Sequence, residues 1–261
     1  MKVNISALLA YDIPEPADIL LAVEAIPMAD QILHTDLLTV NGCGPLTPIN
    51  GMDGLGQRVW LHASGLLNIA YTATVSIERM ATSIAGLNPP PHAELPNAYI
   101  PYLMPSRYCP SDQLGNFVNT RFNAPDKGRM IMQMAEWIHE SIAYIPGSSG
   151  VMTTALDTFV TRAGVCRDFA HLLITFARAA DVPARMVSAY AQGIKPPDFH
   201  ALVEVYLDGR WHLVDPSRLT PEDNIVRIAV GRDATDISFM TIFGIGNMLA
   251  QSVEVNEVVK L

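Results

Sequence analysis

The most informative segment of the chain reads Gly164-Val165-Cys166-Arg167-Asp168-Phe169-Ala170-His171-Leu172-Leu173. Its apolar residues continue at helical spacing as far as Phe176 and Ala177, so we expect a helix from about Cys166 to Ala180. The sulfur of Cys166 would then lie at the helix N-terminus, where free backbone N–H groups and the helix dipole favour a thiolate over a thiol. Most free cysteines are small, buried, apolar side chains, so Cys166 needs chemical partners before it qualifies as a nucleophile.

A hairpin further along the chain supplies two partners. Strand-like patterns occur at 185–189, 200–207 and 210–215, and Asp208-Gly209 is typical of a two-residue hairpin turn. With this turn at the centre, Leu202 opposes Asp215, and His200 becomes the diagonal neighbour of Asp215 on one face of the sheet. Diagonal neighbours lie about 7–8 Å apart at Cα, which these side chains can bridge. A bulge that shifted the register by one residue would instead turn Asp215 to the opposite face.

Cys166, His200 and Asp215 form a candidate catalytic triad of nucleophile, base and orienting carboxylate, in chain order. Taken singly, His200 could be an ordinary strand histidine and Asp215 a strand-end carboxylate, but the three together favour catalysis. A thiolate that attacks a carboxamide forms a thioester and releases an amine or ammonia; water or a second amine then resolves the acyl-enzyme. The backbone N–H of Cys166 is a candidate donor to the oxyanion.

Six short motifs occur in order between about residues 144 and 235. They are Thr153-Thr154-Ala155, Ala163 to His171, Val182 to Ser188, Phe199-His200-Ala201, Glu204 to Tyr206, and Trp211 to Pro216. Together they resemble the core of the bacterial transglutaminase-like superfamily, whose members are often labelled cysteine proteases and carry a papain-like Cys-His-Asp triad. The resemblance implies that Cys166 attacks, His200 is the base and Asp215 orients it, in a cysteine peptidase or amidase that needs no cofactor.

The same resemblance implies a fold in which the nucleophile lies at a helix N-terminus packed on an antiparallel sheet. The segment from Val230 to Asp236 is similar to members of a bacterial subgroup that typically has an N-terminal β region. Leu202 departs from the family pattern, because many relatives carry tryptophan after the His-Ala pair. This difference bears on access to the site or on which acceptor is used. The segment from Tyr102 to Tyr108 resembles a family segment near the site, and it equally fits a linker that packs its aromatic rings.

The first third of the chain has the pattern of a β domain. Short apolar runs at 18–26, 31–40, 57–63 and 65–79 are separated by glycine, proline and asparagine, which is typical of a sandwich or barrel. A proline-dense stretch between Asn88 and Pro105 then predicts a linker. We therefore expect an α+β protein, with an N-terminal all-β, sandwich-like domain at 1–95 and a transglutaminase-like catalytic domain at 96–261.

Two more helices are expected before the cysteine. Apolar residues from Met130 to Ile142 recur at helical spacing, and Pro125-Asp126 suits the first turn. The run that starts at Thr154 has the form of a capping box, and Gly164 suits the exit from this second helix.

Composition excludes several classes of protein. Charged residues are 16% and apolar residues 49% of the 261, which indicates a compact globule with little disorder. The net charge of −9, without a basic run, argues against a nucleic-acid partner. Residues 1–23 carry three acidic residues where a signal peptide needs an apolar stretch, and no window is apolar enough to span a membrane. The three cysteines, without a Cys-x-x-Cys pair, suit a reducing compartment, so we expect a cytoplasmic protein that is not bound to membranes.

Other candidate sites are weaker. A zinc site of Cys166, His171 and His200 lacks the usual closely spaced ligand pair, and His171 projects to a different face of the helix, which favours a structural role. Asp168 suits the free N–H groups of the first helical turn, although it could also line the cleft. No phosphate-binding loop and no calcium loop is present, so neither a cofactor nor a metal is expected. Cys43 and Cys109 have no basic neighbour in sequence and are expected to be inert.

The predicted function is that of a cysteine-dependent hydrolase or acyltransferase that acts on a peptide or protein substrate. Two alternatives stay open: a binding or scaffolding module that retains the fold, and an amine N-acyltransferase that uses the same triad. The sequence does not decide between hydrolysis and transamidation, and it leaves a homo-oligomer open.

Overall fold

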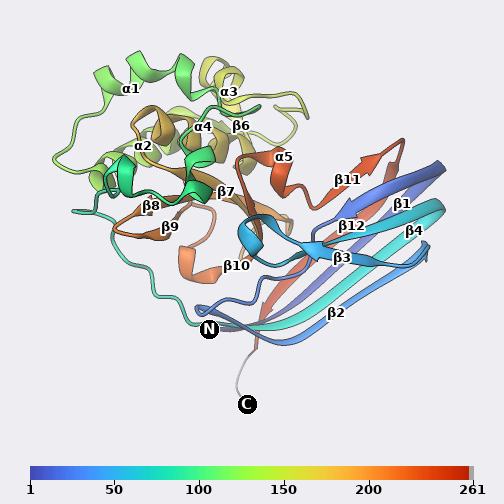
Figure 1. Cartoon of the computed structure of the whole chain (residues 1–261). Helices are drawn as coiled ribbons and strands as arrows, with labels where there is room; N and C mark the ends of the chain where they lie inside the picture. The colour runs from blue at the N-terminus through green and yellow to red at the C-terminus, as the bar shows by residue number, and fades with distance from the viewer. Residues whose placement is uncertain (259–261) are drawn as a thin grey trace.

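The computed structural model describes residues 1–258 and contains two main β-sheets, one of them covered by helices (Figure 1). The four-stranded sheet has the order β10-β7-β8-β9, built from β7 (Ala184–Ala191), β8 (His200–Leu207), β9 (Arg210–Val214) and β10 (Ile225–Gly231). The six-stranded sheet contains β1 (Lys2–Leu21), β2 (Gln31–Cys43), β3 (Thr47–Asn50), β4 (Gln57–Ile77), β11 (Met240–Phe243) and β12 (Asn247–Glu257). The predicted α+β class is confirmed.

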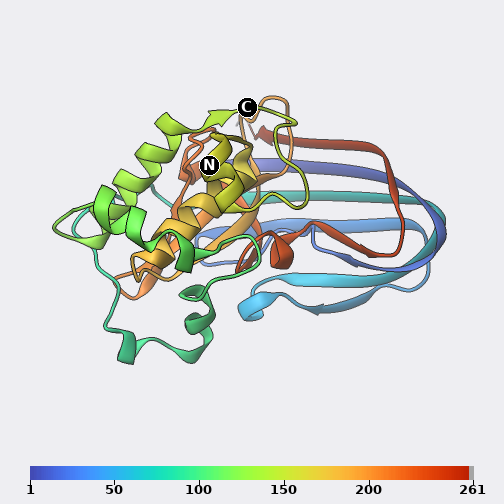
Figure 2. The ribbon, with the colours of Figure 1, turned by 90° about the horizontal axis from the view of Figure 1, so that it is seen from above.

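The helices gather above the four-stranded sheet. The long strands of the six-stranded sheet, referred to below as the long-stranded sheet, extend to one side of it (Figures 1 and 2). The helices are α1 (Gly115–Arg121), α2 (Lys127–Ser141), α3 (Ala155–Thr161), α4 (Cys166–Ala179) and α5 (Ala234–Ile237). Two short strands, β5 (Ala143–Tyr144) and β6 (Ala163–Gly164), pair in parallel just before α4. Within residues 1–258, no helix is both long and apolar enough to cross a bilayer.

Helix α4 is the central element of the helical layer, as its apolar pattern predicts. Leu173 and Phe176 are completely buried and belong to the same core as Val203 and Val205 of β8. Burying each large apolar side chain contributes on the order of 1.5–3 kcal/mol, so this contact fixes α4 on the sheet. The N-terminus of α4, and with it Cys166, is therefore held at one place relative to β8.

The caps of α2 and α3 follow the sequence signals, with one exception. Asp126 accepts a hydrogen bond from the backbone N–H of Arg129 (2.8 Å), and Thr154 caps α3. Helix α3 ends at Arg162, which takes the left-handed conformation (φ 59°), and not at Gly164. The glycine is needed for another reason, because a Cβ atom on Gly164 would lie 2.7 Å from the Cβ of Asp168.

The β region forms one sheet of long strands instead of many short ones. The runs 57–63 and 65–79, expected above as separate strands, form the single strand β4, and Gly65 lies inside it with φ 78°, opposite a register shift in β1 between Ile13 and Ala17. Such a bulge bends both strands without ending them. The expected division at residue 95 stays a prediction. Strands β11 and β12 nevertheless come from the second segment and pair with β1, a connection that the sequence pattern did not indicate.

A buried ionic network joins the β region to the four-stranded sheet. Glu204 of β8 is 1% exposed and accepts from Arg185 and from Arg227, at 2.7 and 2.8 Å. Arg185 also pairs with Asp53 (2.7 Å), and Arg227 with Asp30 (3.0 Å), both in the β region. The two arginines hold the pKa of Glu204 below its usual range, although burial alone would raise it. Glu204 is thus charged and shared between two cations.

We expect Glu204→Gln to lower the free energy of unfolding by about 3 kcal/mol, because it leaves two buried guanidinium groups without their shared counter-ion. Urea denaturation followed by circular dichroism measures the change. The matched control is Glu94→Gln at an exposed position, which should change stability by less than about 0.5 kcal/mol. Equal effects of the two substitutions would contradict the importance of the network.

Candidate active site

Cys166 is the first residue of α4, and the buried carboxylate of Asp168 holds the turn that precedes it. Asp168 is fully buried and accepts from the backbone N–H of Val165 (2.8 Å) and from the hydroxyl of Ser149. Arg167 pairs with the same carboxylate at 3.2 Å. Asp168 therefore has the helix-capping role expected from the sequence, and it fixes the backbone that immediately precedes the cysteine.

The hairpin has the predicted register, and His200 and Asp215 are in contact. Leu207 opposes Arg210, and Nε2 of His200 donates to Oδ2 of Asp215 at 2.9 Å. The other carboxylate oxygen accepts from the backbone N–H (2.9 Å) and the hydroxyl (2.6 Å) of Ser217. Both side chains of the His200–Asp215 pair are at most 2% exposed, so their geometry is set by the protein and not by water.

The thiol of Cys166 is the third member of the cluster, because it lines the same cavity as His200 and contributes to the pKa shift of this histidine. Because Nε2 of His200 is occupied by Asp215, Nδ1 is the nitrogen available to the sulfur. The structure therefore brings together all three residues of the sequence-predicted triad.

The electrostatics of the cluster favour a protonated imidazole. Burial opposes the charge on His200, but its hydrogen bonds with Asp215 and Cys166 outweigh burial and raise its pKa to about 9. Burial likewise opposes ionisation of Asp215, and the bond from His200 overcomes it, so the pKa of Asp215 is lowered. At neutral pH, the His200 imidazolium therefore lies between the Asp215 carboxylate and the Cys166 sulfur.

A cavity of about 660 Å³ opens at Cys166 and His200. Met186 and Ser188 of β7 line it together with Cys166, whereas Tyr11 and Met248 come from the six-stranded sheet. The cavity thus lies between the helical layer and the long strands, which are separate in sequence and adjacent in space (Figure 2). Its size is that of a site for a small molecule or a short peptide segment.

One rim of this cavity is the segment 145–153, between β5 and α3. Several hydrogen bonds hold this segment in place. Nη2 of Arg167 donates to the carbonyl of Gly150 (2.8 Å), the Tyr108 hydroxyl donates to the carbonyl of Val151 (2.7 Å), and Ser149 bonds to Asp168. The rim is therefore anchored to the turn that carries the cysteine.

Tyr144 is a site residue that sequence reasoning missed. It pairs with Gly164 in the β5–β6 ladder, two residues before Cys166, and its phenol lies close enough to Cys166 for the two groups to interact. Burial and the nearby charge on Cys166 raise the pKa of Tyr144 to about 12, so its hydroxyl keeps the proton. A two-residue parallel strand has no periodicity, so the only signal was an aromatic residue before the turn at Pro146-Gly147.

His171 has the structural role expected from its position. It is completely buried, and its Nε2 accepts from the backbone N–H of Ala234 (3.1 Å) while the ring stacks on Tyr108. Burial lowers the pKa of His171 to about 3, so the ring is neutral. Among residues 1–258, no group of three or more His, Cys, Asp and Glu side chains lies close enough to hold a metal ion.

The remaining candidates lie away from the sulfur or are unreactive. Burial raises the pKa of Cys109 to about 12, and burial also raises that of Cys43. The segment from Tyr102 to Tyr108 combines both interpretations given above. Tyr102 packs edge-on against Trp211 (5.4 Å between centroids), whereas Tyr108 lines the cavity.

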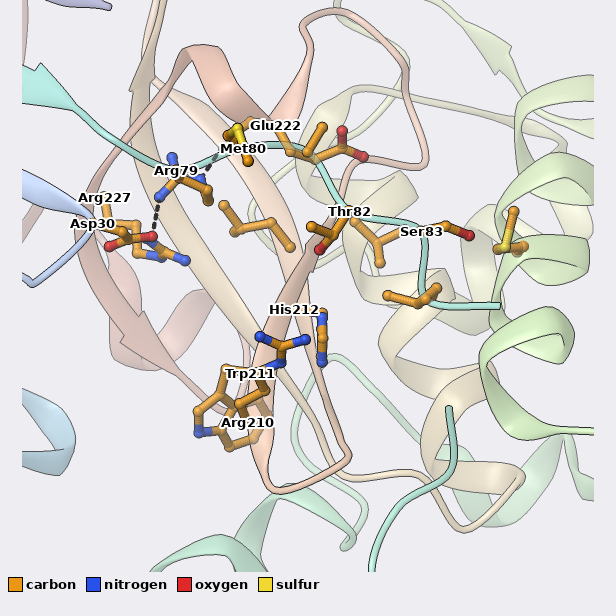
Figure 3. A pocket seen from close by; sticks show the side chains of 15 residues that line it. Asp30, Arg79, Met80, Thr82, Ser83, Arg210, Trp211, His212, Glu222 and Arg227 are labelled. Atoms are coloured by element: carbon orange, nitrogen blue, oxygen red, sulfur yellow. Dashed lines mark hydrogen bonds and ion pairs between the residues drawn. The ribbon is translucent and has the colours of Figure 1, made fainter. Parts of the chain in front are cut away.

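A second cavity, of about 410 Å³, lies along β9 and the segment that follows β4 (Figure 3). None of the triad residues lines it. Its most buried charged groups are already paired, because Arg79 and Arg227 both bond to Asp30, at 2.7 and 3.0 Å. His212 has its Nε2 directed to the carbonyl of Leu207 (3.1 Å). The chemistry expected from the sequence therefore belongs to the first cavity.

Comparison with known proteins places the site in a family context. The family model of the transglutaminase-like superfamily matches residues 117–216, a range that includes Cys166, His200 and Asp215. The crystal structure of a "putative cysteine protease" from Cytophaga hutchinsonii is 33% identical, with a TM-score of 0.91, and the match covers 100% of this chain and 91% of that one.

Two more distant proteins are also similar. An uncharacterized protein from Mycobacterium leprae is 29% identical over 152 residues, and the matched region spans about half of each chain (52% and 52%). The periplasmic domain of TgpA from Pseudomonas aeruginosa, bound to ethylmercury, is 18% identical with a TM-score of 0.41, over 81% of this chain and 76% of that one.

The raised pKa of His200 predicts a loss of stability in mild alkali. A group whose pKa rises on folding stabilises the fold fully below its unfolded value, near 6.5, and this contribution disappears as the pH passes the folded value, about 9. We expect the free energy of unfolding to fall by about 2–3 kcal/mol between pH 6.5 and 9.5.

Asp215→Asn should shrink this fall, because it removes the charge that stabilises the imidazolium. His92→Gln, at an exposed position, should leave it unchanged. Urea titrations at a series of pH values provide the measurement. A fall of the same size in Asp215→Asn would show that the His200–Asp215 pair does not cause it.

Proposed function

Because the chain belongs to the transglutaminase-like superfamily, we propose that it is a cysteine-dependent amide-bond hydrolase or acyltransferase working through a thioester acyl-enzyme. One observation carries this proposal: a thiol at a helix N-terminus contacts an imidazole that a buried carboxylate holds. In this assignment, Cys166 is the nucleophile, His200 the general acid and base, and Asp215 the residue that orients His200.

Acylation begins from the ion pair. The Cys166 thiolate attacks the carbonyl carbon of a peptide or side-chain amide and forms a C–S bond. The electrons of the C–O π bond move to the oxygen, which gives a tetrahedral intermediate with an oxyanion. His200, protonated at neutral pH because of its raised pKa, gives its proton to the departing nitrogen as the C–N bond breaks. The products of this half-reaction are a thioester on Cys166, a neutral imidazole and a free amine or ammonia.

Deacylation returns the proton. Neutral His200 removes a proton from water or from a second amine, which attacks the thioester carbonyl, and the sulfur leaves as a thiolate beside the new imidazolium. Water yields a carboxylic acid, and an amine yields a new amide. Asp215 keeps the ring oriented through both steps, because its bond to Nε2 leaves Nδ1 directed at the reacting atoms.

Two donors are assigned to the oxyanion. The backbone N–H of Cys166 lies at the start of α4, where no carbonyl of the preceding turn is available to it. The Tyr144 hydroxyl is beside this N–H and keeps its proton, so it can donate a second hydrogen bond.

The rival functions make different demands on the thiol. A binding or scaffolding module needs no reactive sulfur, whereas an amine N-acyltransferase would accept an acyl thioester and not an amide. The contact of Cys166 with a buried His200–Asp215 pair favours a catalytic role over a scaffold. The cytoplasmic location and the lack of a cofactor remain predictions.

Alkylation by iodoacetamide tests the nucleophile without a known substrate. We expect Cys166 to react at pH 6 at least about tenfold faster than a small-molecule thiol, because the neighbouring imidazolium stabilises the thiolate. His200→Ala should abolish this advantage. The rate constant is followed by mass spectrometry of the modified peptide. Alkylation that follows an ordinary thiol across the pH range would refute the catalytic assignment.

Turnover of an amide substrate, identified from a peptide library, tests the triad. Cys166→Ala should lower kcat by at least about 10⁴-fold, His200→Ala by nearly as much, and Asp215→Asn by less. Cys43→Ala is the matched control and should retain activity, since this cysteine lies in the long-stranded sheet. Activity that survives Cys166→Ala would end the proposal.

Tyr144→Phe tests the second oxyanion donor. Loss of one such donor costs on the order of 10²-fold in kcat, and we expect KM to change little, because the bond strengthens only as the oxyanion forms. Steady-state kinetics on the same amide substrate give both constants. An unchanged kcat would remove Tyr144 from the mechanism.

A further inference from the structure

Exposed apolar side chains border the Cys166 cavity on two sides. Val151, on the 145–153 rim, lines the cavity with 76% of its surface exposed. Met248 of β12 lines it from the long-stranded sheet and is 57% exposed. Large apolar side chains that remain exposed around a cavity are typical of a binding surface.

On both sides, a further exposed apolar residue is adjacent in sequence to a residue that lines the cavity, since Val151 and Gly246 both line it. Met152 follows Val151 and is 68% exposed, and Ile245, in the turn between β11 and β12, is 63% exposed. A ligand confined to the cavity would leave these residues in water. A longer chain that passes over Cys166 would cover all four.

The two borders are held in place and do not collapse onto each other. Val151 is fixed through its carbonyl by the Tyr108 hydroxyl (2.7 Å), and Met248 lies in the ladder opposite Tyr11 of β1.

Ser188, on the cavity wall and 6% exposed, has a hydroxyl without a hydrogen-bond partner among residues 1–258. An unpaired buried hydroxyl is costly, so this wall has a polar group available to a ligand.

We propose that the Cys166 cleft binds a polypeptide acyl donor with apolar side chains on both sides of the reacting amide, one against Val151 and Met152 and the other against Met248 and Ile245. This inference rests on the proposed function and adds the class of substrate. It also gives the long-stranded sheet a role, because β12 supplies one of the two binding surfaces. The flexible thioether of Met248 suits apolar partners of different shapes.

Two pentapeptides with a central chloroacetylated side chain test the proposal. In each, the thiolate displaces chloride and forms a thioether, so the rate reports binding next to Cys166. One peptide carries two leucines on each side of the reactive residue, and the other carries serines. We expect the leucine peptide to label the native protein at least about tenfold faster, because each apolar side chain that is buried favours binding by about this factor or more.

Met248→Ser and Val151→Ser should each lower the rate with the leucine peptide about three- to tenfold relative to the rate of the same variant with the serine peptide. Leu37→Ser is the matched control, since this leucine is 62% exposed on β2 and does not line the cavity. It should alter neither rate. Equal labelling by the leucine and serine peptides, or variants that leave the leucine rate unchanged, would overturn the proposal.

Failure of the proposed function has a different signature. In that case chloroacetamide would react with Cys166 no faster than with a small-molecule thiol, and no peptide would accelerate labelling. A reactive Cys166 without a preference for the leucine peptide would instead refute only the inference about the substrate.

Discussion

The site depends on one carboxylate that water does not reach. Asp168 bonds to the backbone on the N-terminal side of Cys166, to Ser149 of the neighbouring rim and to Arg167. The same group therefore orients the helix N-terminus and anchors a wall of the cleft. Gly164 is part of this arrangement, because any larger residue would occupy the space that the carboxylate needs. A nucleophile and its binding surface that share one anchor keep their relative positions when the rest of the molecule fluctuates.

The hairpin and the central helix could be predicted because their signals are local. Asp208-Gly209 takes positive φ at both turn positions (48° and 74°), which fixes the two-residue loop and therefore the register that joins His200 to Asp215. The apolar period of α4 likewise placed Cys166 at a helix start. The cavity wall was not predictable in this way, since the pairing of β1 with β12 joins segments with no shared local pattern. The division of residues 57–79 into two strands was wrong for a related reason, because a glycine at a bulge and a glycine at a break look alike in sequence.

The two sheets act together in this fold. The four-stranded sheet carries the histidine and the aspartate, and the long-stranded sheet closes the opposite side of the cleft with Tyr11 and Met248. Glu204 links them, because each of its two arginine partners also pairs with an aspartate of the β region. Buried ion pairs contribute little net stability compared with apolar packing, yet they are intolerant of displacement. The network thus ties the two sheets together through charges that are paired at the buried Glu204.

The pairing of β1 with β12 joins segments that are translated at opposite ends of synthesis. On a ribosome, residues 2–21 emerge early and must wait for residues 247–257 before that edge of their sheet is covered. The thiol, the imidazole and the carboxylate are all translated before this strand arrives. A nascent chain therefore contains its reactive groups before the residues of β12 that line one side of the cleft have been translated.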